Sequence, residues 1–312
     1  QVQQNTGTIS AVGGDTLHSY GLDVGASVLR ECSYAPASGP LGCTSLPFAL
    51  GPSSNYLGAA VSPLGYRLVW WTGVVDGGGG SFHYVVDYGG GWNGPRSGGA
   101  AGYNDASYVN IAFGGGTEVN RFTLHAQFVS GLAPNWGFHG GVGSGDLGTS
   151  DAVSWSLALA PAGSDAIAST NDVWIDPVSN DAHLLARSEG GAVVYYQRPF
   201  GGVWSAAAFL LDATYRARFV LSGNDLVLVY GPNGGDLAYR LAGPAERPAG
   251  LAIDWAALPE TVVALPADFG PVIAIYPESP SYQTLAPSGI HVALVGQGAE
   301  NRVIHVGIEP GG

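Results

Sequence analysis

Short apolar runs rich in β-branched and aromatic residues recur along the whole chain, and clusters of Gly, Asn, Asp and Pro separate them. Scarcely any stretch keeps a 3.6-residue apolar period over three turns, so helices are not favoured. Runs of this kind, bounded by turn residues, are typical of β-strands. Gly and Pro account for 50 and 20 of the 312 residues and supply the turns. The pattern predicts an all-β fold built from many short strands.

The runs pair into six β-hairpins. Their first segments begin at residues 16, 66, 106, 181, 225 and 290, so the spacings are 50, 40, 75, 44 and 65 residues. Most of these spacings fall near the roughly 40 to 50 residues of a four-stranded propeller blade. The predicted hairpins are 16–22 with 26–32, 66–71 with 81–88, 106–113 with 121–129, 181–187 with 192–198, 225–230 with 236–241, and 290–296 with 301–308.

A single β-propeller of residues 1–312 fits this repeat, because radial stacking covers both faces of every small sheet. Six blades of about 52 residues are the main interpretation, with seven blades and a double-sheet sandwich as alternatives. The last blade is one strand short, and the segment 2–12 is predicted to close the ring by pairing the N- and C-terminal strands. The segments 151–160 and 251–265 are interpreted as outer strands, loop insertions or an additional blade.

Charge and composition exclude several classes of function. The net charge of −13 opposes binding to nucleic acid or to an anionic membrane surface. All 11 basic residues are Arg, so Schiff-base chemistry and a phosphate-binding P-loop lysine are excluded. No apolar run reaches the roughly 18 residues of a membrane-spanning helix. Neither nucleic acid nor membrane is therefore expected as a partner.

The only two cysteines, Cys32 and Cys43, enclose a Gly- and Pro-rich loop that can bring their sulfur atoms together. We predict a disulfide, which is typical of an oxidising compartment, with a pair of buried thiols as the alternative. The chain begins with Gln1 and contains no Met, so we expect a secreted protein whose signal peptide has been removed. No cofactor is expected, and a Ca²⁺ ion bound by turn carboxylates stays open without assigned residues.

One stretch resembles a blade of the secreted sialidase-like (BNR-type) propellers. The stretch runs through segments 181–187 and 191–198 to Trp204 and Ser205. The turn motif S-x-D-x-G-x-x-W of those families is matched in its first half by Ser179, Asp181 and His183, with His in place of Gly. The resemblance implies a propeller fold and says little about activity.

Some residues would suit an enzyme acting on acidic polysaccharides. Alternation along a strand places Arg216 and Arg218 on one face, where two guanidinium groups can bind a sugar carboxylate. His83, His183 and Tyr215 are the candidates for moving protons in a lyase. The alternative interpretation makes the arginines structural partners of Asp residues and the histidines hydrogen-bonded core residues.

Glycoside hydrolysis is the less favoured enzymatic hypothesis, because it requires a pair of carboxylates. Asp172 and Asp176 flank Trp174 on one strand face and form the pair most worth testing. Turn carboxylates facing solvent are the alternative interpretation of both residues.

A binding or structural role requires less of the sequence. Trp70, Trp71, Trp92 and Trp136 lie on or beside Gly-rich turns, where exposed rings could stack on sugars, although packing between blades is the alternative. We therefore predict an extracellular binding or assembly module. Its expected partner is a glycan or the extracellular matrix, with self-association through a terminal strand as a further option and a polysaccharide lyase as the alternative function.

Overall fold

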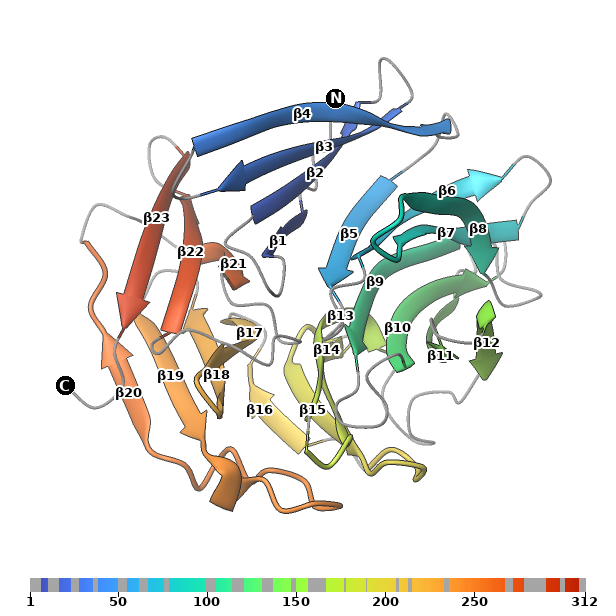
Figure 1. Cartoon of the computed structure of the whole chain (residues 1–312). Coiled ribbons are helices and arrows are strands. Elements are labelled where there is room, and N and C mark those ends of the chain that lie inside the picture. Colours follow the sequence, from blue (N-terminus) through green and yellow to red (C-terminus); the bar gives the residue numbers. More distant parts are fainter. Residues whose placement is uncertain are drawn as a thin grey trace. The chain divides into compact units, whose positions relative to one another are not determined.

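The structure of the chain is a computed structural model, shown in Figure 1. It divides into two compact units, residues 1–160 and residues 161–312, which are described one at a time. Among the described residues, no helix has the length and apolar character needed to cross a membrane. The described residues are 7–10, 17–23, 28–35, 39–49, 55–61, 67–75, 79–98, 105–113, 121–130, 137–146, 150–156, 167–176, 178–188, 190–205, 208–212, 215–232, 236–266, 272–277, 290–297 and 301–308.

The first unit holds three antiparallel four-stranded sheets within its described residues. Each strand pairs with its neighbour in sequence, so every sheet is an up-and-down meander (Figure 1). The strands of the three sheets are β1 (Gly7–Ser10), β2 (Leu17–Asp23), β3 (Val28–Ala35) and β4 (Gly39–Ala49); β5 (Asn55–Val61), β6 (Arg67–Val75), β7 (Gly79–Asp87) and β8 (Trp92–Gly98); and β9 (Asp105–Phe113), β10 (Arg121–Ser130), β11 (Gly137–Asp146) and β12 (Ser150–Ser156).

The second unit repeats the same meander. Its described residues form two four-stranded sheets and one three-stranded sheet. The strands are β13 (Ile167–Ile175), β14 (Ala182–Ser188), β15 (Val193–Arg198) and β16 (Ala208–Leu211); β17 (Tyr215–Ser222), β18 (Asp225–Pro232), β19 (Leu237–Ala242) and β20 (Glu260–Val263); and β21 (Val272–Pro277), β22 (Ile290–Gln297) and β23 (Asn301–Ile308).

All six predicted hairpins are present, as the pairs β2–β3, β6–β7, β9–β10, β14–β15, β18–β19 and β22–β23. The all-β prediction is therefore confirmed. Both long gaps contain an outer strand: β12 lies in the first gap and β20 in the second. Strands are recognised in this way because alternating burial and turn residues are local signals, which need no knowledge of the remote chain.

Contrary to the prediction from the sequence, the N-terminal strand does not pair with the last sheet. The described part of segment 2–12, β1, pairs with β2 in the first sheet, from Gly7 opposite Tyr20 to Ser10 opposite Leu17. Only the residues 11–16 separate the two strands, so closing this hairpin costs little loop entropy. The expected pairing of this segment with the last sheet is therefore wrong for Gly7–Ser10, and the sheet β21–β23 keeps three strands among the described residues.

The core of the second unit lies on both faces of the sheet β17–β20. Successive residues of β17 point to opposite faces. Phe219 joins a cluster that contains Trp174 and Tyr195 from the sheet β13–β16, whereas its neighbour Val220 joins a cluster that contains Val272 from β21. The sheet β17–β20 is thus buried between residues of the two sheets that flank it in the sequence.

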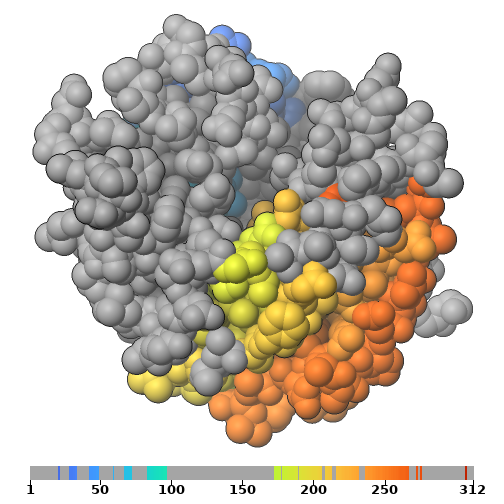
Figure 2. Space-filling model, turned by 180° about the vertical axis from the view of Figure 1, so that it is seen from behind, coloured from blue at the N-terminus to red at the C-terminus, as the bar shows by residue number. Residues whose placement is uncertain are grey.

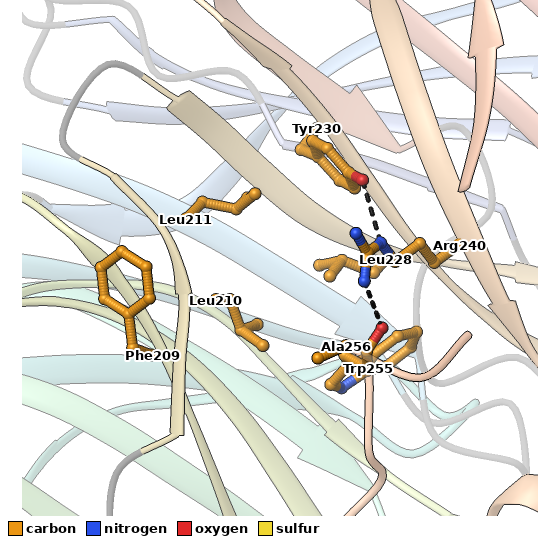
Figure 3. Close-up of a pocket in the computed structure, with 8 residues that line it drawn as sticks. All are labelled: Phe209, Leu210, Leu211, Leu228, Tyr230, Arg240, Trp255 and Ala256. Carbon is orange, nitrogen blue, oxygen red and sulfur yellow. Dashed lines mark hydrogen bonds between the residues drawn. The ribbon is translucent and has the colours of Figure 1, made fainter. Parts of the chain in front are cut away.

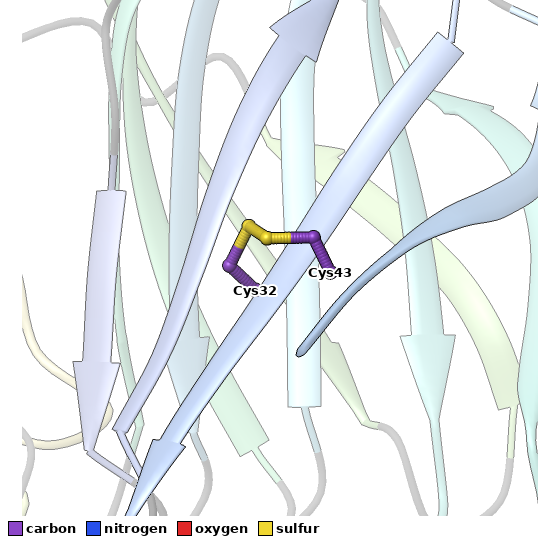
Figure 4. The surroundings of a disulfide bond; sticks show 2 residues. All are labelled: Cys32 and Cys43. Carbon is purple, nitrogen blue, oxygen red and sulfur yellow. A yellow bond between two sulfur atoms is a disulfide. The ribbon is translucent and has the colours of Figure 1, made fainter. Parts of the chain in front are cut away.

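The predicted disulfide is confirmed. Cys32 of β3 and Cys43 of β4 lie directly opposite each other in the antiparallel register, and their sulfur atoms are bonded (Figure 4). Of the loop residues on which the prediction rested, Pro40 and Gly42 lie within β4, where they pair with Tyr34 and Ser33 of β3. Such a disulfide is typical of proteins in oxidising compartments.

We predict that Phe219→Ala destabilises the protein by about 3–5 kcal/mol, because it leaves a cavity in a closely packed core. The free energy of unfolding in urea measures this loss. Val262→Ala is the matched control: Val262 lies on β20 and is 59% exposed, so its truncation should change stability by less than about 0.5 kcal/mol. Equal effects of the two substitutions would contradict the assignment of Phe219 to the core.

Candidate functional site

A pocket of about 140 Å³ opens in the second unit, next to the sheet β17–β20 (Figure 3). One wall is formed by the outer strand β16, and the opposite wall by β18, β19 and the segment 243–259 that joins β19 to β20. The residues that line the pocket are Phe209, Leu210 and Leu211 from β16, Leu228 and Tyr230 from β18, Arg240 from β19, and Trp255 and Ala256 from the segment 243–259.

The walls of the pocket are mainly apolar. Leu228 and Trp255 are buried members of the core cluster, and Leu210 and Leu211 pack against it. Phe209 is 67% exposed and lies at the rim. In Figure 3 the side chains of Leu210 and Leu211 extend toward Arg240, on the other side of β16 from the ring of Phe209. The pocket therefore offers a ligand an apolar surface next to a cationic group.

The strand register places the polar groups. Arg240 on β19 pairs with Leu228 on β18 and with Glu260 on β20. The three residues therefore lie side by side across the sheet. The Arg240 side chain is held by Nε–H donation to the Tyr230 hydroxyl (3.1 Å) and Nη1–H donation to the Trp255 carbonyl (2.6 Å), both drawn in Figure 3. Its Nη2 donates to Glu260 Oε2 at 3.3 Å. The guanidinium group is thus fixed by three partners.

The charges of these groups follow from their contacts. The Tyr230 hydroxyl donates a hydrogen bond to Glu260 Oε2, and this bond, followed by that from Arg240, holds the pKa of Glu260 below its ordinary value. Burial, together with the bond to Glu260, raises the pKa of Tyr230 to about 12. At neutral pH the site therefore holds a carboxylate, a neutral phenol and a guanidinium ion.

Arg240 has N–H groups that remain for a ligand. A guanidinium group carries five N–H bonds, and the three hydrogen bonds of Arg240 leave two of them for a ligand. Glu260 is exposed at the edge and can accept hydrogen bonds. An apolar wall and two charged donors suit a ligand with one apolar face and an edge of hydroxyl groups.

The arginines proposed for an acidic substrate lie elsewhere in the same unit. Arg216 and Arg218 share one face of β17 and are half-buried. The charge of Arg218 acts on Asp172 of β13, and that of Arg216 acts on Arg187 of β14, whose pKa is lowered first by burial and then by this like charge. Tyr215 begins β17, and its side chain lies outside the described part.

The predicted histidines are packed among aromatic rings. His183 is 2% exposed, and its Nδ1 lies 2.7 Å from the Tyr195 hydroxyl. Burial lowers the pKa of His183 to about 4, although the charges of Asp176 and Asp181 act the other way. His83, in the first unit, stacks on Trp71 with ring centres 5.7 Å apart, and burial lowers its pKa. Both histidines are therefore neutral at pH 7.

The predicted tryptophans have different environments. Trp70 and Trp71 are 5% and 2% exposed, because both faces of β6 are covered. Trp92 is half-buried under Arg67, whose guanidinium carbon lies 4.9 Å from the ring centre. Trp136 lies outside the described residues. Of the four rings proposed to stack on sugars, Trp92 is the one that the described structure places at a surface.

Arg67 forms a second polar cluster, in the first unit. Its guanidinium group binds the carboxylates of Glu31 on β3 and Asp87 on β7. Asp87 also accepts hydrogen bonds from the amides of Gly89 and Gly91. Although burial opposes the effect, the bonds from Arg67 and these amides keep the pKa of Asp87 below its ordinary value. The cluster ties the sheet β1–β4 to the sheet β5–β8.

The carboxylates proposed for hydrolysis bind backbone amides. Asp172 accepts hydrogen bonds from the amides of Val173 (3.0 Å) and Phe219 (2.9 Å), the latter on β17. Asp176 accepts from the amides of Val178 and Ser179 in its own turn. Burial raises the pKa of Asp172 to about 6, against the effect of Arg218 and the two amides.

Sequence reasoning did not find the pocket. Tyr230 and Arg240 lie on a hairpin that was predicted, and alternation puts Leu228, Tyr230 and Arg240 on one face. An Arg among inward-facing residues was a usable signal. Trp255 gave no such signal, because it belongs to a segment without strand periodicity.

Comparison with known proteins shows the fold. No protein-family model and no curated protein matches the sequence. Among solved structures, the BP39L lectin from Burkholderia pseudomallei has a TM-score of 0.64 at 16% identity, over 99% of this chain and 82% of the lectin. The fucose-specific lectin from Aleuria aurantia has a TM-score of 0.53 at 13% identity, over 98% of this chain and 91% of the lectin.

The sialidase-like resemblance has a structural counterpart as well. The Hadza microbial sialidase Hz136 has a TM-score of 0.58 at 11% identity, over 98% of this chain and 65% of the sialidase. The chain therefore has the fold of the β-propeller lectins, which confirms the propeller predicted from the repeated hairpins.

We predict that Asp172 makes the protein less stable as the pH rises from about 4 to about 7. Its folded pKa of about 6 lies above the ordinary value of 3.8, so the folded state keeps a proton that the unfolded state has lost. The shift corresponds to a loss on the order of 2–3 kcal/mol across this window. Unfolding of wild type and Asp172→Asn in urea at both pH values checks it, and identical pH dependence of the two proteins would contradict it.

We predict that Arg67→Ala costs about 3 kcal/mol at neutral pH, because it leaves the buried carboxylates of Glu31 and Asp87 without their counter-ion. The loss should shrink as the pH falls, because protonation of Asp87 in the variant removes a buried charge that has lost its counter-ion. Arg67→Lys keeps the charge without the two-pronged geometry and should lie between the two proteins. A variant with wild-type stability in urea would show that the cluster does not hold the sheets together.

Proposed function

We propose that this protein is a glycan-binding module that takes one terminal sugar ring into the pocket beside Arg240. The carrying observation is the geometry of the pocket: leucine side chains and an indole face a guanidinium group that has two free N–H bonds. A sugar ring has an apolar C–H face and polar hydroxyl edges, so it can satisfy both walls at once. The volume of about 140 Å³ is well below the roughly 300–1,000 Å³ of sites for larger ligands, which favours a single ring.

The lectins with this fold suggest a first sugar to test. One of them is named as fucose-specific, and a mutant of the same lectin was solved with Fucα1-6GlcNAc. Fucose is a 6-deoxy sugar, and its methyl group would find apolar contacts on Leu210, Leu211 and Leu228. Since one fold serves many functions, the pocket and not the fold carries this proposal.

Catalysis is supported less well than binding. A lyase would need a proton-transferring group beside the arginines that hold the uronate. His183 is buried and hydrogen-bonded to the buried Tyr195, which suits a structural role. His83 lies in the other unit of the chain. We therefore propose no catalytic role for Arg216, Arg218, Tyr215, His83 and His183.

The setting that we propose is extracellular, in one six-bladed ring formed by residues 1–312. The disulfide between Cys32 and Cys43 supports an oxidising compartment. The six sheets of the described residues, each built from consecutive strands, and the likeness to the β-propeller lectins support the ring.

Calorimetric titration with methyl α-L-fucoside tests the proposed site. We predict that Arg240→Ala weakens binding by at least about tenfold, because a charged hydrogen-bond donor contributes about 1.5–3 kcal/mol. Arg30→Ala, which removes an exposed arginine of the other unit, should bind like the wild type. In parallel, the wild type is passed over immobilised fucose, galactose, mannose, N-acetylglucosamine and polyuronate. No retention on any of these would overturn glycan binding, and release of an unsaturated uronate would establish the lyase in its place.

A further inference from the structure

The segment 243–259 has little regular structure, although it supplies Trp255 and Ala256 to the pocket. It contains one short 3₁₀ turn, η2 (Pro244–Glu246), followed by isolated turns such as that closed by Leu258 N and Trp255 O. A segment of this kind does not fix its own conformation. Its position must therefore be set by contacts with the sheets around it.

Two side chains bind the backbone of the segment: Asp181, in the turn just before β14, and Tyr195 on β15. The Gly250 amide donates to Asp181 Oδ2 at 2.6 Å, and the Ile253 amide donates to the Tyr195 hydroxyl at 3.3 Å. Figure 2 shows the orange stretch around residue 250 beside the yellow turn near residue 200, and the amide of Phe200 in that turn donates to the other oxygen of Asp181. The segment is thus attached to a sheet other than its own.

The hydrogen bonds at Tyr195 are assigned from the acceptors within its reach. The Tyr195 oxygen accepts from the Ile253 amide, and among the described residues His183 Nδ1, 2.7 Å away, is the acceptor available to the buried O–H of Tyr195. In this assignment His183 Nδ1 is unprotonated and the ring proton is on Nε2, which leaves no buried O–H without an acceptor. Ile253, Tyr195 and His183 are all buried, so water does not replace a lost partner. The order runs from Ile253 N–H through Tyr195 O–H to His183.

The same tyrosine contacts the indole of Trp255. The rings of Tyr195 and Trp255 meet edge to face with centres 6.3 Å apart, and Phe219 stacks on the indole at 6.0 Å. The Trp255 carbonyl accepts the hydrogen bond from Arg240. Tyr195 thus contacts the Ile253 amide and the indole of Trp255 directly. It is connected to the Arg240 guanidinium group through the Trp255 carbonyl.

We propose that Tyr195 and His183 are positioning residues of the sugar pocket: they touch no sugar, and through the Ile253 amide they hold Trp255 and Arg240 in the geometry that binds it. This inference rests on the proposed function. A bound sugar would otherwise have to order the segment 243–259 itself, and that cost would be subtracted from its affinity.

The test uses three substitutions. Tyr195→Phe removes only the hydroxyl, His183→Leu removes the acceptor behind it, and His183→Asn supplies an amide oxygen in place of Nδ1. Tyr239→Phe is the matched control, because Tyr239 is a buried tyrosine on the opposite face of the sheet β17–β20. Thermal melts and circular dichroism establish the folded fraction, and affinities for methyl α-L-fucoside are calculated for folded protein.

We expect Tyr195→Phe to weaken fucoside binding by about five- to tenfold, as the loss of one buried hydrogen bond implies, with Tyr239→Phe unchanged. His183→Leu should lose the same affinity as Tyr195→Phe, and the double variant with both substitutions should lose no more, because the three groups act as one chain. His183→Asn should recover part of the affinity that His183→Leu loses. Amide hydrogen exchange at Ile253 should speed up in Tyr195→Phe and stay slow in the control.

Wild-type affinity in fully folded Tyr195→Phe, together with weak binding by Arg240→Ala, would overturn the positioning role and leave the proposed function intact. Additive losses in the double variant, or no recovery in His183→Asn, would also overturn it. Failure of the wild type to bind any tested sugar would overturn the proposed function and the inference with it, and the Arg240→Ala comparison distinguishes the two cases.

Discussion

The second unit depends on the burial of both faces of one small sheet. In β17, Phe219 and Val220 are adjacent in sequence and are buried on opposite faces, so neither face of the sheet β17–β20 can remain exposed. Residues of β13–β16 cover one face, and residues of β21 contribute to the cover of the other. Near the outer strands, the face is covered by the short strand β16 and the segment 243–259 instead of by regular sheet. The pocket lies in this region.

Apolar packing alone does not fix how two such surfaces meet, because it has no preferred direction. The direction comes from hydrogen bonds that backbone amides of one element donate to carboxylates of another. Asp172 joins β13 to the Phe219 amide of β17, and Asp181 joins the Phe200 and Gly250 amides. The cost appears in the pKa of Asp172, which burial raises to about 6. The buried carboxylate that fixes how these elements meet therefore lowers the stability of the unit.

The sequence predicted what local patterns determine. The six hairpins and the disulfide follow from alternation and turn residues within about 20 positions of one another. It did not show that Trp70 and Trp71 are both buried, because a strand covered on one face and a strand covered on both can carry the same residues. The pocket depends on Leu210, Arg240 and Trp255, which lie on three elements. Their meeting is set by packing between sheets, for which the sequence contains no local pattern.

Arg67 and Arg240 show why an arginine beside a tryptophan is not by itself a binding site. Arg67 lies over Trp92, and two buried carboxylates from different sheets bind its guanidinium group. A ligand would have to break an ion pair to reach it, so the group is a structural tie. Arg240 is held at the Tyr230 hydroxyl, the Trp255 carbonyl and one exposed carboxylate, and two N–H bonds remain beside an apolar wall. The second arrangement fixes the cation without saturating it, which is the condition for recognising a neutral polar ligand.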